Sequence, residues 1–159
     1  MGREIYETKR KALKINLTPE FDGTFAEIGA GQEVARNFFE AGAASGTIAK
    51  TMSAYDMTFS DAIYGAEESG RYVSRTRLTK MICREFALLE ERLHGDKYDK
   101  RLFFAFANTV TTLNFSKTND PHGWIGIRFQ HEVDSPPNDV IIHIRLLDSD
   151  NTLQQKVLG

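Results

Sequence analysis

Residues 25–42 read FAEIGAGQEVARNFFEAG, a short apolar run followed by a glycine turn and then a helical pattern. Gly29 and Gly31 permit positive φ angles and a close approach of the backbone to its neighbours. A helix that begins near Gln32 presents free N–H groups at its start, where anions bind readily. Two interpretations follow. Gly29, Gly31 and Gln32 form a phosphate-binding cradle, or they form only a tight connection between a strand and the helix packed on it.

The composition indicates one ordinary globular domain. The chain has 159 residues, of which 41% are hydrophobic, enough to bury a core without disulfides or metal. We therefore treat residues 1–159 as a single domain. The net charge of −2 and the pI of about 6.1 argue against a chain built to bind nucleic acid or an anionic membrane.

Cysteine content and hydropathy point to a cytoplasmic protein. Cys83 is the only cysteine in the sequence, so no disulfide forms within the chain, which fits a reducing compartment. The N-terminus has no signal-peptide pattern, and no apolar run approaches the roughly 18 residues that a membrane-spanning helix needs. We expect no membrane partner.

The first half of the chain mixes helical and strand-like patterns. Ser74 is a natural N-cap, and the helix after it keeps apolar residues at helical spacing until Gly95. The segment before that helix, YDMTFSDAIYG, fits either a short helix or an aromatic loop. The other expected elements are a helix over residues 3–14, a strand over 24–28, a helix over 32–41 and a strand over 47–55.

The second half is rich in strands. Residues 101–115, 123–133 and 139–148 are strand-like runs separated by SKTNDPH and DSPPN, with no helix between them. This order predicts an α+β fold, with a mixed sheet flanked by helices and an antiparallel C-terminal half. The alternative is an α/β three-layer arrangement.

The last residues predict a short helix. Asp150 or Ser149 caps it, and Leu153 begins an apolar face that stops after about two turns, a length that is marginal alone. We expect the chain to be the N-terminal part of a longer protein, whose C-terminal remainder is then a partner of this domain.

The glycine turn resembles the first motif of class I methyltransferases, an acidic residue followed by GxG at the end of the first strand. Here the motif reads EIGAG at residues 27–31. In that family the loop holds S-adenosylmethionine, and an acidic residue at the end of the next strand holds the ribose. The resemblance implies an S-adenosylmethionine-binding, methyltransferase-like domain with Asp56 in the ribose position, although Glu33 replaces the usual third glycine.

The same turn, taken from residue 23, resembles the GxFxPxHxGH signature of nicotinate-mononucleotide adenylyltransferases. Gly23, Phe25 and Gly31 match that signature at the right spacing. Gly29 and Gln32 stand where the family has its two phosphate-facing histidines, and neither replaces the charge of an imidazole. The resemblance implies nucleotide binding with an incomplete motif for adenylyl transfer.

Residues 20–94 as a whole resemble an uncharacterised bacterial family often labelled nicotinate-nucleotide adenylyltransferase. Members of that family carry AEIGAGQEVARxFF, SAYDMxxSDAIYG and YVSRxRL, and all three stretches occur here. Members also run well beyond 159 residues, in agreement with the expectation of a longer protein.

A second group of candidate ligand-binding residues lies at the start of the long helix. Basic side chains beside a helix N-terminus are unfavourable for the helix dipole unless an anion lies there. Ser74, Arg75 and Arg77 would bind a phosphate or carboxylate together with the free N–H groups. The alternative is a solvated basic face paired with Asp61, Glu67 or Glu68.

Asp56 has two interpretations as well. If the glycine turn is a site, the end of the next strand lies beside it, and Asp56 or Asp61 would hold a ribose hydroxyl or a metal-bound phosphate. Alternatively, Asp56 caps a short helix that begins at Met57.

The last hairpin supplies a further candidate patch. If DSPPN joins the two strands, matching their apolar faces puts Arg128 near Arg145 and Gln130 near His143. Like charges opposed across strands cost stability unless a carboxylate or a bound anion lies beside them. We therefore consider Arg128, His143 and Arg145 as a second anion-binding patch, with a neighbouring carboxylate as the alternative.

The sequence supports no metal site, because its histidines and carboxylates lack ligand spacing. It also lacks any complete catalytic motif, so whether the chain is an enzyme stays open, as does its oligomeric state. The first expectation is a domain that binds a nucleotide or a small phosphorylated metabolite at the glycine turn. The alternatives are the S-adenosylmethionine-binding domain and a non-enzymatic interaction or assembly domain.

Overall fold

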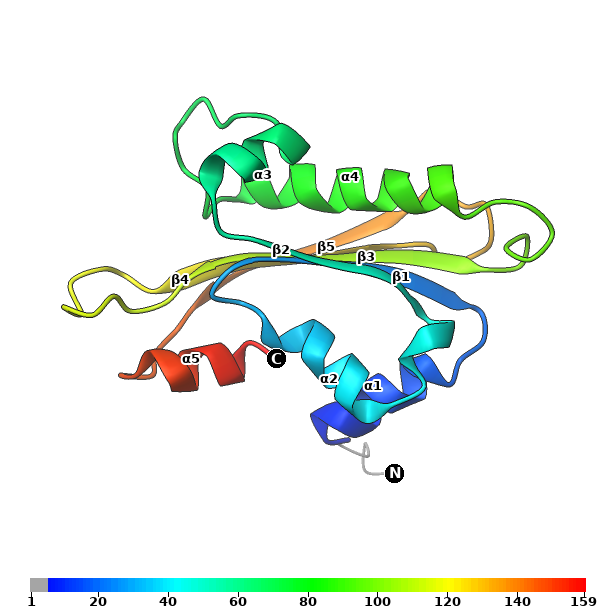
Figure 1. Cartoon of the computed structure of the whole chain (residues 1–159), viewed down its shortest axis with the longest axis horizontal. Coiled ribbons are helices and arrows are strands. Elements are labelled where there is room, and N and C mark those ends of the chain that lie inside the picture. The colour runs from blue at the N-terminus through cyan, green and yellow to red at the C-terminus, as the bar shows by residue number, and fades with distance from the viewer. Residues whose placement is uncertain (1–5) are drawn as a thin grey trace.

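The computed structural model describes residues 6–159 and contains one five-stranded sheet with the strand order β2-β1-β3-β4-β5 (Figure 1). The strands β1, β2 and β3 are parallel, whereas β4 and β5 are antiparallel to their neighbours. The predicted mixed sheet with an antiparallel C-terminal half is therefore confirmed. The strands are β1 (Phe21–Gly29), β2 (Ile48–Ala54), β3 (Leu102–Thr111), β4 (His122–Phe129) and β5 (Asn138–Arg145).

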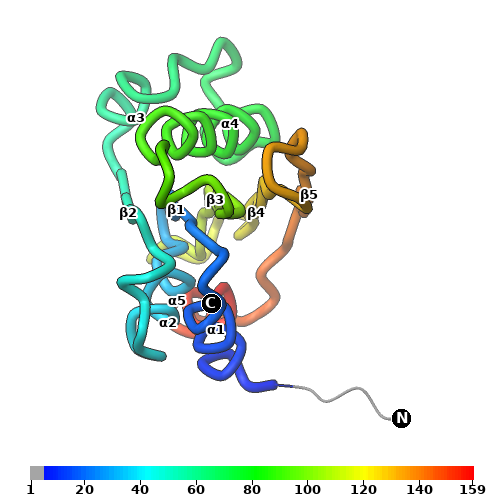
Figure 2. Tube along the Cα trace, turned by 90° about the vertical axis from the view of Figure 1, so that its right-hand side faces the viewer, coloured from blue at the N-terminus to red at the C-terminus, as the bar shows by residue number. Residues whose placement is uncertain are grey.

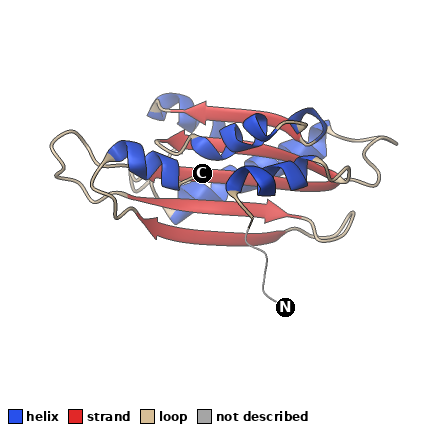
Figure 3. Ribbon diagram, turned by 90° about the horizontal axis from the view of Figure 1, so that it is seen from below, coloured by secondary structure: helices blue, strands red, loops and turns tan. Residues whose placement is uncertain are grey.

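Helices cover both faces of the sheet (Figures 1 and 2). In the view of Figure 1, α3 and α4 lie above the sheet, and α1, α2 and α5 lie below it. The same three lower helices lie in front of the strands in the view from below (Figure 3). The bounds are α1 (Thr8–Asn16), α2 (Glu33–Ala41), α3 (Met57–Tyr64), α4 (Arg75–Arg92) and α5 (Asn151–Val157), with a 3-10 turn over Ala44–Gly46.

The upper core forms where α4 packs on the middle of the sheet. Small side chains on β3, Ala105 and Ala107, are fully buried and leave room for the helix. The helical spacing of apolar residues after Ser74 places one face of α4 against them. The buried residues of that face are Leu78, Met81, Ile82, Phe86 and Leu89.

Local signals in the sequence fix most element boundaries. Ser74, Asp56 and Asp150 each accept a hydrogen bond from a backbone N–H in the first turn of the following helix, which confirms them as N-caps. The helix after Ser74 ends at Arg92, before Gly95. Of the helix predicted over residues 3–14, residues 3–5 lie outside the described part, and the rest forms α1 with a later start and a later end.

Within residues 6–159, none of the helices is both long enough and apolar enough to cross a membrane.

Candidate functional site

The glycine turn between β1 and α2 is tightly packed against β3. Gly29 has a φ of +77°, and a Cβ there would lie 2.3 Å from the carbonyl oxygen of Val110. A Cβ at Gly31 would lie 2.6 Å from Oδ1 of Asn108. Both glycines therefore have a steric reason within the fold, as the tight-connection interpretation requires.

A carboxylate of the chain itself occupies the start of α2. The side chain of Glu27 is buried, and its two oxygens accept hydrogen bonds from the backbone N–H groups of Val34 and Ala35, each at 3.1 Å. Asn108 donates a further bond to Glu27 at 3.0 Å. Because a helix N-terminus attracts negative charge, Glu27 fills the place that the cradle hypothesis gives to a phosphate.

Gln32 completes this internal network. Its side-chain amide donates to the carbonyl oxygens of Glu27 and Gly29, both at 2.9 Å. Burial raises the pKa of Glu27, and the hydrogen bonds from Ala35, Val34 and Asn108 offset that rise only in part. The turn is thus locked by its own side chains, and an added ligand has to bind beside it.

A pocket of about 390 Å³ lies beside the turn, between α2 and β2. Its volume falls within the range of small-molecule sites. Glu27 pairs with Ser53 in the parallel register, and Phe25 pairs with Thr51, so Ser53 and Thr51 face α2 as Glu27 does. We call this cavity the edge pocket; its lining residues are Glu27, Gln32, Ala35, Arg36, Phe39, Thr51, Met52 and Ser53.

Arg36 and Phe39 form the α2 wall of the edge pocket. The side chain of Arg36 is 61% exposed, and its ion-pair partner among the described residues, Glu33, lies 3.7 Å away, beyond hydrogen-bond distance. Phe39 lies one turn further along α2 and is 53% exposed. The pocket therefore offers a cation and an aromatic ring on one wall and hydroxyl groups on the other.

The pocket adjoins a point where the chain leaves neighbouring strands in opposite directions. From β1 the chain enters α2 below the sheet, and from β2 it enters α3 above the sheet (Figure 1). Ile28 and Ala54 are paired at the carboxyl ends of these two parallel strands. Open parallel sheets bind ligands outside the carboxyl ends of their strands, and the expected juxtaposition of the glycine turn with the end of the next strand is present at this edge. The strand order itself reverses between β1 and β3.

Asp56 serves α3 at this same edge. One of its carboxylate oxygens accepts a hydrogen bond from the N–H of Phe59 at 2.7 Å, the capping arrangement that the sequence offered as an alternative.

The predicted basic group at the start of α4 lies on the other face of the sheet. Ser74 caps the helix by accepting from the N–H of Arg77 at 3.1 Å. The guanidinium of Arg77 is buried and donates to Asp61 at 2.6 Å, and it lies 3.3 Å from Glu67. Arg77 is therefore paired inside the fold, whereas Arg75 is exposed to solvent.

The carboxylate of Asp61 is held in its charged form by its neighbours. A hydrogen bond from the hydroxyl of Tyr72 and the guanidinium of Arg77 lower the pKa of Asp61. This network links α3 to α4 around the buried guanidinium, so the structure gives Arg77 a role in packing and does not bring it to the glycine turn.

The expected register of the last hairpin is wrong. Arg128 lies opposite Asp139 and makes two hydrogen bonds to its carboxylate, at 2.7 and 2.8 Å. Arg145 lies opposite His122 and donates to Asp120 at 2.8 Å. The apolar faces do match, but the connecting loop covers residues 130–137 and is longer than DSPPN, so the strands pair in a different register.

The remaining pairs of that patch are corrected in the same way. His143 lies opposite Trp124, and the two rings stack with centroids 4.4 Å apart. Gln130 instead accepts a hydrogen bond from the N–H of Phe103. Arg128 and Arg145 therefore each have a carboxylate partner, and no arginine pair is left for an anion to neutralise.

Sequence reasoning missed the residues that line the edge pocket, apart from Gln32. A signal was available for some of them. Arg36 and Phe39 are three residues apart on a helix, and Thr51 and Ser53 are two apart on a strand, so each pair shares a face. If the shared face of each pair had been placed on the side of the sheet that carries Glu27, the lining of the pocket could have been predicted. Among residues 6–159, no group of three or more histidine, cysteine, aspartate or glutamate side chains is placed to hold a metal ion.

Comparison with known proteins finds similarity at the level of structure. No protein-family description and no curated protein matches the sequence. The competence/damage-inducible protein CihA from Agrobacterium tumefaciens superposes with a TM-score of 0.67 at 17% identity, covering 99% of this chain and 93% of that one.

Two further solved structures are similar. The competence damage-inducible protein A (ComA) from Klebsiella pneumoniae has a TM-score of 0.66 at 11% identity and covers 95% of this chain and 88% of its own. A CinA superfamily protein from Escherichia coli has a TM-score of 0.63 at 10% identity, covering 98% and 88%. At these identities the similarity establishes a shared fold, that of bacterial competence-damage proteins.

Proposed function

We propose that this chain binds a nucleotide or a phosphorylated metabolite in the edge pocket. The observation that carries the proposal is the position of Arg36, an exposed arginine whose ion-pair partner Glu33 lies beyond hydrogen-bond distance, in a pocket at the carboxyl ends of β1 and β2. Guanidinium groups bind phosphate oxygens through paired hydrogen bonds, so Arg36 supplies the contact that the occupied start of α2 no longer offers.

The charges of the pocket orient the ligand. A phosphate beside the carboxylate of Glu27 would be repelled, so the phosphate lies at the Arg36 end. Groups that donate hydrogen bonds, such as ribose hydroxyls, suit the oxygen atoms of Ser53 and Thr51 on the strand side. The exposed ring of Phe39 offers a stacking surface for a base. A nucleotide satisfies all three regions, whereas inorganic phosphate satisfies one.

Binding is proposed, and adenylyl transfer is not. The positions that carry phosphate-facing histidines in the adenylyltransferase signature are Gly29 and Gln32 here. The first has no space for a side chain, and the second uses its amide within the turn. The resemblance to nicotinate-nucleotide adenylyltransferases thus supports a nucleotide as the ligand, but the residues that adenylyl transfer needs are missing.

The S-adenosylmethionine alternative lacks a specific contact in its favour. Its ribose-binding acid would be Asp56, whose carboxylate already caps α3. S-adenosylmethionine also has no phosphate for Arg36, so it serves as a comparison ligand in the test.

A thermal-shift screen tests the proposal. ATP or nicotinate mononucleotide at 100 times its Kd should stabilise the protein by about 2.7 kcal/mol, which raises Tm by roughly 5–10 °C. Inorganic phosphate and S-adenosylmethionine should give smaller shifts. The absence of any shift with phosphate-bearing nucleotides would refute the proposal, as would a larger shift with S-adenosylmethionine.

A further inference from the structure

The strand β5 is an open edge of the sheet. It pairs only with β4 and is the last strand in the sheet order, at the right-hand margin of Figure 2. In the described part of the chain, no backbone hydrogen bond outside the β4 pairing involves residues 138–145. A row of backbone N–H and C=O groups therefore remains available for pairing with another strand.

The side chains of β5 do not protect this edge. The run Val140, Ile141 and Ile142 carries no charge and no proline, and Val140 and Ile142 are 46% and 51% exposed. Exposed edges of soluble proteins usually carry a central charge or proline that prevents pairing. An exposed edge strand with an apolar, β-branched centre is typical of an interaction surface.

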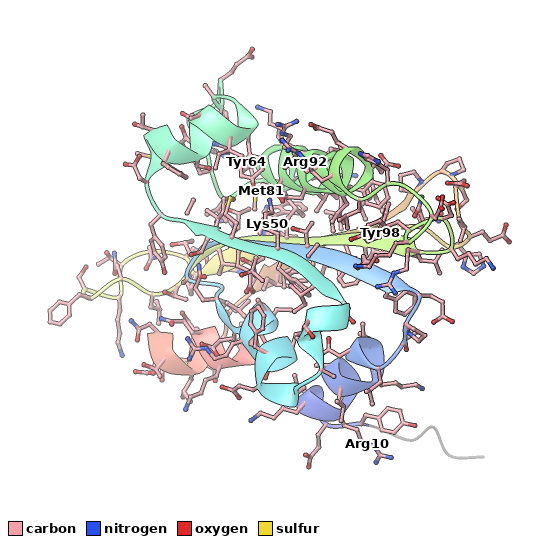
Figure 4. The ribbon with its side chains drawn as sticks, turned by 45° about the vertical axis from the view of Figure 1, so that its right-hand side comes forward. Arg10, Lys50, Tyr64, Met81, Arg92 and Tyr98 are labelled. Atoms are coloured by element: carbon pink, nitrogen blue, oxygen red, sulfur yellow. The ribbon has the colours of Figure 1, made fainter. Side chains whose placement is uncertain are left out.

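The opposite edge of the sheet is built differently. The side chain of Lys50, in the middle of β2, points toward α4 (Figure 4) and forms an ion pair with the buried carboxylate of Glu85. The exposed side chains of β2 are Ala49, Thr51 and Ser53, of which two are polar. The apolar exposed edge is thus specific to β5.

The sequence of β5 is complementary to itself when two copies run antiparallel. With Ile142 opposite its own copy, Val140 lies opposite Ile144 of the partner subunit, and Asp139 lies opposite Arg145 of the partner subunit. One face of the joint is then wholly apolar, and the other brings opposite charges together at each end. Such a two-fold contact uses the same patch on both copies and closes without forming a filament.

The charges already fixed on β4 and its loop extend this match. Arg128 holds Asp139, and Asp120 holds Arg145, within one copy. Across the joint, Asp139 of one copy would lie beside Arg145 of the partner subunit. The two ion pairs would then form one row of alternating charge, from Arg128 of one copy to Asp120 of the partner subunit. Opposite charges on neighbouring strands stabilise a pairing, and like charges oppose other registers.

From these observations we infer that β5 joins β5 of a second copy of this chain, antiparallel and about a two-fold axis at Ile142. The two sheets then continue as one across the joint. This inference concerns assembly and is independent of the ligand proposed for the edge pocket.

Sedimentation equilibrium of the chain at about 1 to 100 µM, the affinity range of moderate interfaces, tests the assembly. The expected mass at the upper end is twice 18.0 kDa. Ile142→Lys places two like charges at the axis and should weaken dimerisation about 100-fold or more, with an unchanged circular dichroism spectrum. Thr51→Lys, on the other edge, is the matched control and should leave the dimer intact. A monomer at all concentrations, or a dimer that survives Ile142→Lys, overturns the inference.

Cysteine cross-linking tests the register without depending on affinity. In a Cys83→Ser background, Ile142→Cys places two thiols opposite each other at a separation that suits a disulfide. Oxidation should therefore link the Ile142→Cys chains into a covalent dimer, whereas Val140→Cys, which faces Ile144 of the partner subunit, should stay largely unlinked. Equal linking of both variants, or linking of Thr51→Cys instead, would contradict the arrangement.

Discussion

Two helices of this chain begin at the same end of the sheet, α2 below it and α4 above it, and both starts carry sequence patterns of an anion site. At each start the chain supplies its own negative charge. Glu27 binds the N–H groups of α2, and Asp61 and Glu67 bind Arg77 of α4. The two regions differ in what surrounds them. Arg77 is buried, whereas Arg36 of α2 is exposed beside a pocket.

This difference separates an arginine that holds the fold together from one that is available to a ligand. Burial distinguishes the two arginines, and it is not visible in the local sequence. The comparison predicts that variants at the start of α4 change stability, whereas variants in the edge pocket change binding.

The largest effect is expected from Arg77→Met. Removing the guanidinium leaves the carboxylates of Asp61 and Glu67 without their buried partner, which should cost about 3–5 kcal/mol of unfolding free energy. Urea unfolding followed by circular dichroism measures it. Arg75→Met, at an exposed position in the same turn, is the control and should change stability by less than about 0.5 kcal/mol. Equal losses of stability in the two variants would contradict the structural role of Arg77.

Glu27→Ala should have the next largest effect. The substitution leaves the N–H groups of Val34 and Ala35 without their acceptor in a buried place, at an expected cost of about 2–3 kcal/mol. Chemical denaturation gives this value. A loss below about 1 kcal/mol would mean that water or another group caps α2, and the start of the helix would again be open to a phosphate.

Gly29→Ala isolates the packing of the turn. Gly29 and Gly42 both have positive φ, but only at Gly29 does an added Cβ meet backbone, the oxygen of Val110 at 2.3 Å. We expect Gly42→Ala to cost about 1 kcal/mol and Gly29→Ala about 2–4 kcal/mol. Comparable losses of unfolding free energy in the two variants would show that the backbone around Gly29 can shift to accept a Cβ. That result would contradict the tight-connection interpretation.

The pH dependence of Glu27 is the smallest predicted effect. Burial raises the pKa of Glu27 above its ordinary value of 4.5, so the folded state holds this proton more tightly than the unfolded state. The stability that the wild type gains from this proton is present below pH 4.5 and is lost as the pH rises through the folded-state pKa. The difference in unfolding free energy between wild type and Glu27→Gln should therefore shift against the wild type between pH 4.5 and neutral pH. A shift in its favour would contradict the assignment.

The parts of the fold that depend on residues close together in the sequence were predictable. Ser74, Asp56 and Asp150 are N-caps because each meets an N–H two or three residues along the chain. The alternation of apolar residues in the last two strands correctly predicted which residues share a face across the pair, with Ile125 opposite Ile142 and Ile127 opposite Val140. It did not predict burial, because Val140 and Ile142 are exposed and Ile141 packs on the core.

The parts that depend on distant contacts were not predictable. The register of β4 with β5 depends on the length of the loop over residues 130–137, and the pattern of alternation alone is compatible with several registers. Arg77 gives no local sign of burial, because its partners come from α3 and the segment after it. Arg36 becomes a candidate only when β2 is placed beside α2.

Isothermal titration calorimetry of three proteins measures whether Arg36 binds the nucleotide. Wild type, Arg36→Ala and Arg75→Ala are each titrated with ATP and with nicotinate mononucleotide. Arg36→Ala should weaken the binding of the nucleotide by about tenfold or more, equivalent to roughly 1.4 kcal/mol, while Arg75→Ala should bind within about twofold of wild type. Equal affinities of wild type and Arg36→Ala, or a loss confined to Arg75→Ala, would contradict the proposed role of Arg36 and return the ligand to the start of α4.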